Sequence, residues 1–210
     1  VTLVVADALA DTVLGAKGRG LDLDSYNKGD KAIPWQVVET VKGTDLTGIR
    51  YRQLFPWVNP GDGAFRVIPG DYVSTDEGTG IVHIAGTFGA DDNRVSRLNN
   101  VPPLHLLDKD GNIRPMVDPT GKFYLLSDLD TEFVAKNVDV EAYRPWEGKF
   151  VKNAYDPAKK EGDETLDVEL CMFMKQHGMV FRIEKHVHSY PHCWRTDKPV
   201  LYYPLDSWFI

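Results

Sequence analysis

A glycine-rich stretch with one histidine and two adjacent aspartates is the part of the sequence best suited to chemistry. Glycines on both sides of a strand let the backbone approach a ligand closely. Asp91 and Asp92 fall where a following helix would begin, and the helix dipole and free N–H groups there favour an ionised carboxylate. Such a group is suited to holding an ammonium group and poorly suited to donating a proton at neutral pH. The stretch is Gly78-Thr79-Gly80-Ile81-Val82-His83-Ile84-Ala85-Gly86-Thr87-Phe88-Gly89-Ala90-Asp91-Asp92.

The same residues also have purely structural explanations. One of the two aspartates could simply cap the helix, since Asp is among the preferred N-cap residues. His83 could be a core histidine with its hydrogen bonds satisfied. Gly78-Thr79-Gly80 is a weak phosphate-binding signal, because the full dinucleotide pattern and a long following helix are missing. From residue types alone these alternatives stay open.

The elements that must position this stretch are mainly short strands. Four segments rich in β-branched residues and bounded by glycine or proline read as strands, which favours a barrel or a strongly curved sheet. Asp110-Gly111 predicts a hairpin turn between 104–107 and 113–116. The expected fold is therefore mixed α/β, mainly β, with a β-barrel and peripheral helices. The four segments are 37–41, 63–67, 72–74 and 81–85.

Helices are expected as additions to this barrel. Ser127 followed by Asp130 resembles a capping box, and a second helix is predicted over 164–177, with Gly178 as its C-terminal stop. Residues 179–188 alternate between apolar and polar side chains, which predicts a strand.

Composition narrows the class of protein. A hydrophobic share of 42% supports a sizeable core, and a net charge of −7 argues against a surface that attracts nucleic acid throughout. No apolar run approaches the ~20 residues that cross a bilayer. Cys171 and Cys193 do not form a disulfide framework, so we expect reduced thiols in a soluble cytoplasmic protein. The apolar start and aromatic end predict a piece of a longer protein.

Several motifs in this order resemble the editing domain of the isoleucyl-tRNA synthetase family. The first is 78–92, and the others are Trp57, 63–73, Pro115-Met116-Val117-Asp118-Pro119-Thr120-Gly121 and Tyr190-Pro191-His192-Cys193-Trp194-Arg195. The last motif favours the isoleucyl enzyme over its valyl and leucyl relatives. The resemblance covers nearly the whole chain. It implies an editing domain over 1–189 and a return segment towards the catalytic domain over 190–210.

The resemblance also implies residue roles and partners. Asp92 corresponds to the carboxylate that holds the substrate's α-amino group, and His83 to the histidine at the side-chain end of the pocket. Gly78, Thr79 and Gly80 correspond to the pocket wall. The implied substrate is valine mistakenly attached to the acceptor end of tRNA(Ile), or valyl-adenylate. No cofactor is implied for editing, although the full-length enzyme uses ATP and Mg. We expect a monomer without membrane contact.

Two departures from the family pattern matter. The family's threonine-rich strand, which contributes to the editing pocket, would lie upstream of Val1, so editing by this piece could be weak. Gly86 stands where the family usually has proline, which would loosen the loop before Asp92. ATP-site motifs are also absent from the sequence, so this piece is not expected to make aminoacyl-adenylate.

Two other function classes compete with editing. His186, His188, His192 and Cys193 could form the zinc site of a hydrolase, with Asp92 as a ligand or base, although their spacing matches no common zinc pattern. The loose basic cluster Lys149, Lys152, Lys159 and Lys160 could instead mark a non-catalytic RNA-binding module. Asp156, Glu161 and Asp163 dilute that cluster, and a charge run of this kind is usually a solvated surface.

Overall fold

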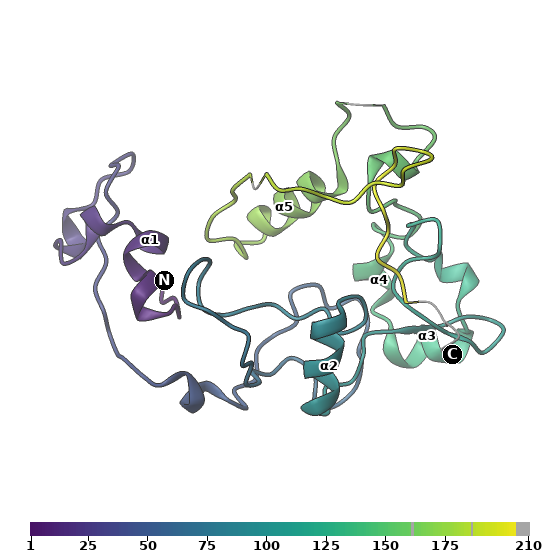
Figure 1. Ribbon diagram of the computed structural model, residues 1–210, viewed down its shortest axis with the longest axis horizontal. Helices are drawn as coiled ribbons and strands as arrows, with labels where there is room; N and C mark the ends of the chain where they lie inside the picture. Colours follow the sequence, from purple (N-terminus) through teal and green to yellow (C-terminus); the bar gives the residue numbers. More distant parts are fainter. Residues whose placement is uncertain (161, 186, 205–210) are drawn as a thin grey trace. The chain divides into compact units, whose positions relative to one another are not determined.

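The structure, a computed structural model, describes residues 1–160, 162–185 and 187–204 (Figure 1). The chain divides into two compact units: unit 1 contains 1–51 and 65–84, and unit 2 contains 52–64 and 85–210. Each unit is described by itself. No helix in the described ranges is long and apolar enough to cross a membrane.

Unit 1 is built from short helical turns joined by extended chain. One α-helix, α1 (Ala10–Leu14), lies among four 3-10 turns: η1 (Asp7–Leu9), η2 (Ala16–Gly18), η3 (Leu23–Ser25) and η4 (Gly43–Leu46). Its buried apolar residues are Leu9, Ala10, Val13 and Trp35. The indole N–H of Trp35 donates to the carbonyl of Gly15 over 2.8 Å, so the ring is fixed by a hydrogen bond as well as by packing.

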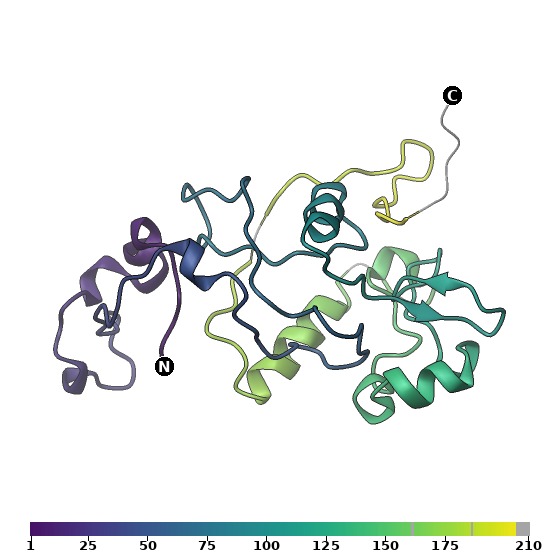
Figure 2. The ribbon, with the colours of Figure 1, turned by 90° about the horizontal axis from the view of Figure 1, so that it is seen from below.

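Unit 2 holds the larger core and most of the regular structure. Figure 2 shows β1 and β2 as paired arrows. The elements are α2 (Ala90–Leu98), β1 (Leu106–Leu107), β2 (Ile113–Arg114), η5 (Leu126–Asp128), α3 (Thr131–Asn137), α4 (Val140–Tyr143), η6 (Asn153–Tyr155) and α5 (Leu166–Gln176). The core residues are Trp57, Val58, Leu106, Met116, Val117, Phe123, Leu129, Tyr143, Trp146 and Leu166. Tyr143 is fully buried, and its hydroxyl donates to the carbonyl of Tyr124 over 2.7 Å.

The predicted hairpin is confirmed. β1 and β2 pair antiparallel, with Leu106 opposite Arg114 and Leu107 opposite Ile113. Gly111 adopts a φ of 79° in the turn between them. An Asp-Gly pair supplies the left-handed conformation that such a turn requires, which is why the sequence located it.

The two predicted helices are also present, with one change of cap. α5 ends at Gln176 and is followed by Gly178 at φ 67°. Asp130, and not Ser127, caps α3: its carboxylate accepts from the N–H of Phe133 over 2.8 Å. Ser127 belongs to the preceding turn η5 instead.

The expected barrel and the predominance of strands are not confirmed. Strand pairing in the described residues consists of the two-stranded β1–β2 sheet and isolated bridges such as Arg50 with Arg66. The segments 37–41 and 81–85 are extended and 72–74 begins in a turn at Tyr72, but no ladder joins any of them. Because a strand needs a partner for its backbone groups, sequence alternation alone does not make a sheet. Val38 is 78% exposed, so this part of unit 1 buries no sheet face.

The strand predicted over 179–188 is wrong for the residues that the structure describes there. The described part of this segment carries no strand or bridge, and its apolar side chains Phe181, Ile183 and Val187 are exposed. Alternation normally marks a strand with one buried face, and here neither set of side chains is buried. His186 lies outside the described residues.

Candidate functional site

The start of α2 positions Asp92 in a way that differs from simple capping. The N-cap of α2 is Gly89, and neither Asp91 nor Asp92 caps the helix; both lie in its first turn. Oδ2 of Asp92 accepts a hydrogen bond from the backbone N–H of Ala85 over 2.9 Å. The capping explanation is therefore wrong, because the carboxylate reaches back across the preceding loop.

The loop before α2 is tied to the helix at several points. The N–H of Phe88 donates to the carbonyl of Ala85 over 2.9 Å, and the N–H of Asn93 to the carbonyl of Gly89 over 2.8 Å. The side-chain amide of Asn93 donates to the carbonyl of Gly86 over 2.7 Å. These bonds fix the loop that presents Asp92, so Asn93 is a positioning residue that the sequence did not single out.

Two glycines make this loop possible. A Cβ on Gly89 would lie 3.0 Å from both Cγ and Oδ2 of Asp92, and a Cβ on Gly86 would lie 2.6 Å from Oγ of Ser96. Ser96 is only 7% exposed, so it has little room to yield. Gly86 is therefore a close-packing position. The sequence predicted that Gly86 would loosen the loop before Asp92, but at this position the loop packs closely against Ser96 of α2.

The two aspartates have different surroundings. Asp92 is half-buried, and among the described residues no hydrogen bond reaches its Oδ1. Asp91 is exposed, with its Oδ1 3.8 Å from Nε of Arg94. One carboxylate is held by a backbone amide with its second oxygen available, and the other belongs to a solvated ion pair of little energetic weight. Asp92 is the better candidate to hold an ammonium group.

The other predicted site residues belong to unit 1. His83 is exposed on extended chain. The turn Gly78-Thr79-Gly80 contacts the N-terminal segment: the N–H of Ala6 donates to the carbonyl of Thr79 over 2.8 Å, and a Cβ on Gly80 would lie 2.5 Å from that of Ala6. Because His83 and Asp92 belong to different units, the pocket that the resemblance implies remains a prediction.

The zinc alternative gains no support from the described residues. Within 1–160, 162–185 and 187–204, no three His, Cys, Asp or Glu side chains gather in a way that could hold a metal ion. Nδ1 of His192 instead lies 2.8 Å from the carbonyl oxygen of Asp197. His186, the remaining member of the proposed set, lies outside the described residues.

The basic cluster is divided among separate local contacts. Lys149 pairs with Glu169, and its ammonium lies 5.0 Å from the ring centre of Trp146. Lys159 donates to the carbonyl of Glu164 over 3.3 Å. These contacts are those of solvated, structural lysines, while Glu161 lies outside the described residues.

Asp108 is the carboxyl group with the strongest hydrogen-bonding environment, and its role is structural. Backbone N–H groups of Asp110 and Asn112 donate to its Oδ1 over 3.0 and 2.8 Å, and Nε of Arg114 donates to its Oδ2 over 2.7 Å. The Asn112 backbone bond, followed by Arg114, lowers the pKa of Asp108 to about 2. Both oxygens of this carboxylate already accept hydrogen bonds from its own hairpin, so it is unsuited to catalysis.

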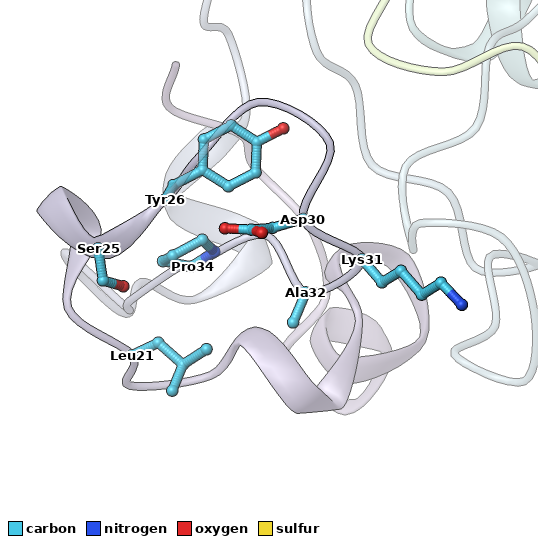
Figure 3. Close-up of a pocket in the computed structure, with 7 residues that line it drawn as sticks. All are labelled: Leu21, Ser25, Tyr26, Asp30, Lys31, Ala32 and Pro34. Carbon is cyan, nitrogen blue, oxygen red and sulfur yellow. The ribbon is translucent and has the colours of Figure 1, made fainter.

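A pocket of about 310 Å³ lies in unit 1, apart from all the predicted site residues (Figure 3). Asp30 contributes to its lining, but its Oδ2 already accepts from the N–H of Asn27 over 2.8 Å. Figure 3 shows Lys31 extending away from the other lining side chains. The polar groups do not converge on one point, as they would in a built ligand site. The lining residues are Leu21, Ser25, Tyr26, Asp30, Lys31, Ala32 and Pro34.

Comparison with known proteins gives a consistent result. The chain is 59% identical over all its 210 residues to an isoleucine–tRNA ligase of Bacteroides fragilis and 57% identical to that of Porphyromonas gingivalis. It is 39% identical to that of Clostridium acetobutylicum over 84% of its length. The chain spans 18% and 19% of the length of the first two relatives. No family model matches it.

Proposed function

The chain is a segment of the isoleucine–tRNA ligase family, and from that premise we propose that it carries the hydrolytic editing site of such a ligase. The proposed substrate is valine attached in error to tRNA(Ile), with valyl-adenylate as a second possible substrate. The observation that carries the proposal is the half-buried Asp92 carboxylate, held by the N–H of Ala85 at the start of α2.

A second site answers a physical limit on amino-acid selection. One missing methylene changes binding by only about 1–3 kcal/mol, a limit for which this enzyme family is itself the standard illustration. A synthetic site that accepts isoleucine therefore admits valine. A second pocket that accepts the smaller side chain and excludes the larger one removes the error by hydrolysis.

In the proposed reaction, water cleaves the ester between valine and the terminal ribose. The water oxygen attacks the ester carbonyl carbon, the bond from that carbon to the ribose oxygen breaks, and the ribose oxygen takes up a proton. The products are valine and uncharged tRNA. The carboxylate of Asp92 holds the α-ammonium of valine, and no side chain acts as the nucleophile.

The geometry of Asp92 supports this role. The Ala85 amide and the loop bonds from Asn93 fix the carboxylate before any substrate arrives. Positioning a reactant in advance lowers the entropic part of the barrier. Charge-assisted bonds between ammonium and carboxylate are stronger than neutral ones, so one oriented carboxylate can set the direction in which the ester lies. His83 is assigned to the side-chain end of the pocket.

The β-barrel belongs to this proposal as well. Unit 1 exposes Val37, Val38, Ile81 and Val82 on extended chain. Exposed β-branched residues on extended segments suit strands that pair with further chain. The relatives are far longer than this segment. We therefore place the closed barrel in the full-length ligase.

The test uses a hybrid ligase: the full-length isoleucine–tRNA ligase of Bacteroides fragilis in which this chain replaces the matching segment. The hybrid is then incubated with valyl-tRNA(Ile) and isoleucyl-tRNA(Ile). We expect rapid release of valine and slow release of isoleucine. Equal stability of the two esters in a hybrid that still aminoacylates would refute the editing assignment.

A further inference from the structure

The segment 190–203, here called the aromatic hairpin, doubles back on itself within unit 2 (yellow in Figure 2). The N–H of Cys193 donates to the carbonyl of Lys198 over 2.8 Å, and the N–H of Val200 to that of Pro191 over 2.9 Å. Asp197 adopts a φ of 54° at the reversal. Asp tolerates this left-handed conformation better than most residues, so the turn is encoded locally.

The aromatic hairpin is anchored to the rest of unit 2. The hydroxyl of Tyr155, which lies outside the hairpin, donates to the carbonyl of Pro199 over 3.0 Å. Within the hairpin, the hydroxyl of Tyr190 donates to the carbonyl of Val200 over 2.8 Å. Tyr203 packs against the main core. The hairpin is therefore a shaped surface and not a loose tail.

This surface carries aromatic rings that stay exposed. Trp194 is 85% exposed and Tyr202 57%, while Trp208 and Phe209 lie outside the described residues. Tyr190 meets Tyr202 edge to face, with ring centres 6.2 Å apart. Exposed apolar surface that is grouped in one place is a feature of interaction sites.

Each of two rings has a cation over it. The guanidinium of Arg195 lies 4.6 Å from the ring centre of Trp194, and the ammonium of Lys152 lies 4.3 Å from that of Tyr190. Cation–π pairing fixes the cation beside the ring. Trp194 remains largely exposed despite this contact, so ring area is left for a further stacking partner.

The local charge differs in sign from that of the whole chain. Between 187 and 204 the sequence has two cations, Arg195 and Lys198, and one carboxylate, Asp197, against a net charge of −7 overall. Oδ1 of Asp197 lies 3.6 Å from Nδ1 of His192. Lys152 adds a third cation. A local positive charge among exposed rings is the combination that binds single-stranded nucleic acid.

We propose that the aromatic hairpin binds single-stranded RNA, with a base stacked on Trp194 and phosphates near Arg195 and Lys198. The inference rests on the proposed function in one respect, since an editing substrate brings an unpaired tRNA end to this chain. Stacking is tolerant of sequence because every base has a π-face. The hairpin therefore contributes affinity, and the selection of valine is left to the editing pocket.

The test is a titration of a labelled single-stranded RNA of about 12 nucleotides ending in CCA, a length within known site sizes. The whole 210-residue chain is added, and fluorescence anisotropy is followed at low and moderate salt. We expect Trp194→Ala to weaken binding about tenfold, the order that loss of one stacked base gives. We expect Arg195→Gln to weaken binding and to reduce the slope of log affinity against log salt concentration by the amount expected for about one lost phosphate contact. Tyr26→Ala, an exposed aromatic in unit 1, is the matched control and should bind as the parent does.

Either of two results would overturn the inference. One is equal affinity of the parent, Trp194→Ala and Arg195→Gln; the other is equal affinity for the single strand and for a duplex of the same sequence. The parent and the same variants are also placed in the hybrid ligase and assayed there for valyl-tRNA hydrolysis, which separates the two proposals. If Trp194→Ala weakens RNA binding but the parent hybrid does not hydrolyse valyl-tRNA, the editing proposal alone is refuted. If the parent hybrid hydrolyses valyl-tRNA but Trp194→Ala binds RNA as the parent does, the RNA-binding proposal alone is refuted.

Discussion

The backbone N–H of Ala85 donates a hydrogen bond to Oδ2 of Asp92 over 2.9 Å, which joins the end of a glycine-flanked segment to the first turn of α2. The two residues lie seven positions apart in the chain. The Asn93 amide closes the same loop a second time at Gly86. The carboxylate that we assign to substrate binding is thus fixed by main-chain chemistry next to it.

Gly89→Ala should damage the site more than the fold. The added Cβ would lie 3.0 Å from Cγ and Oδ2 of Asp92, which forces the carboxylate away from the Ala85 amide. Small displacements of a binding group cost up to about 100-fold in rate, so we expect a 10- to 100-fold loss of valine release by the hybrid ligase.

Gly43→Ala is the matched control for this prediction, because nothing lies within 4 Å of a Cβ at that position. It should leave both hydrolysis and the melting temperature near those of the parent. Normal hydrolysis by Gly89→Ala would show that the Asp92 geometry has no bearing on the reaction.

Gly86→Ala should destabilise unit 2 because of its contact with α2. Its Cβ would meet Oγ of the buried Ser96 at 2.6 Å, and overpacking of this kind costs about 1–3 kcal/mol. Urea denaturation measures the effect. Combining it with Ser96→Ala, which removes the clashing oxygen, should recover part of the loss. A single variant as stable as the parent would contradict the close packing.

Asp108 should make the protein sensitive to acid. Backbone hydrogen bonding from Asn112, aided by Arg114, lowers its pKa from 3.8 to about 2. Because the folded pKa is the lower one, the stabilisation is complete above pH ~4 and is lost as the pH falls towards ~2. Melting temperatures across this window should fall less steeply in Asp108→Asn than in the parent. Identical slopes would show that other carboxyl groups cause the loss of stability at low pH.

The thiol of Cys193 should be alkylated faster than a thiol without its hydrogen-bonding neighbours. The hydroxyl of Thr196, followed by backbone N–H groups of Arg195 and Thr196, lowers the pKa of Cys193 and so raises the thiolate fraction. In a Cys171→Ser background, Thr196→Val should slow alkylation by iodoacetamide several-fold. An unchanged rate would mean that the hydroxyl does not stabilise the thiolate.

Features that depend on local sequence were predicted correctly, whereas strands that depend on pairing with distant residues were not. The Asp110-Gly111 hairpin and the Gly178 stop depend on the conformation of one or two residues. The strand predicted over 179–188 required a partner that no local pattern specifies. The sequence singled out Asp92 as a candidate, but its hydrogen bond from Ala85 depends on how the loop closes. Two glycines spaced around that loop were the available signal.

The most direct test of the account compares Asp92→Asn with Asp91→Asn in the hybrid ligase. Both variants remove one negative charge from the first turn of α2, but only Asp92 accepts the Ala85 bond, whereas Asp91 lies exposed beside Arg94. We predict that Asp92→Asn abolishes release of valine from valyl-tRNA(Ile), whereas Asp91→Asn releases valine at nearly the parent rate. Aminoacylation by both variants should be nearly unchanged. Normal valine release by Asp92→Asn would contradict the central claim.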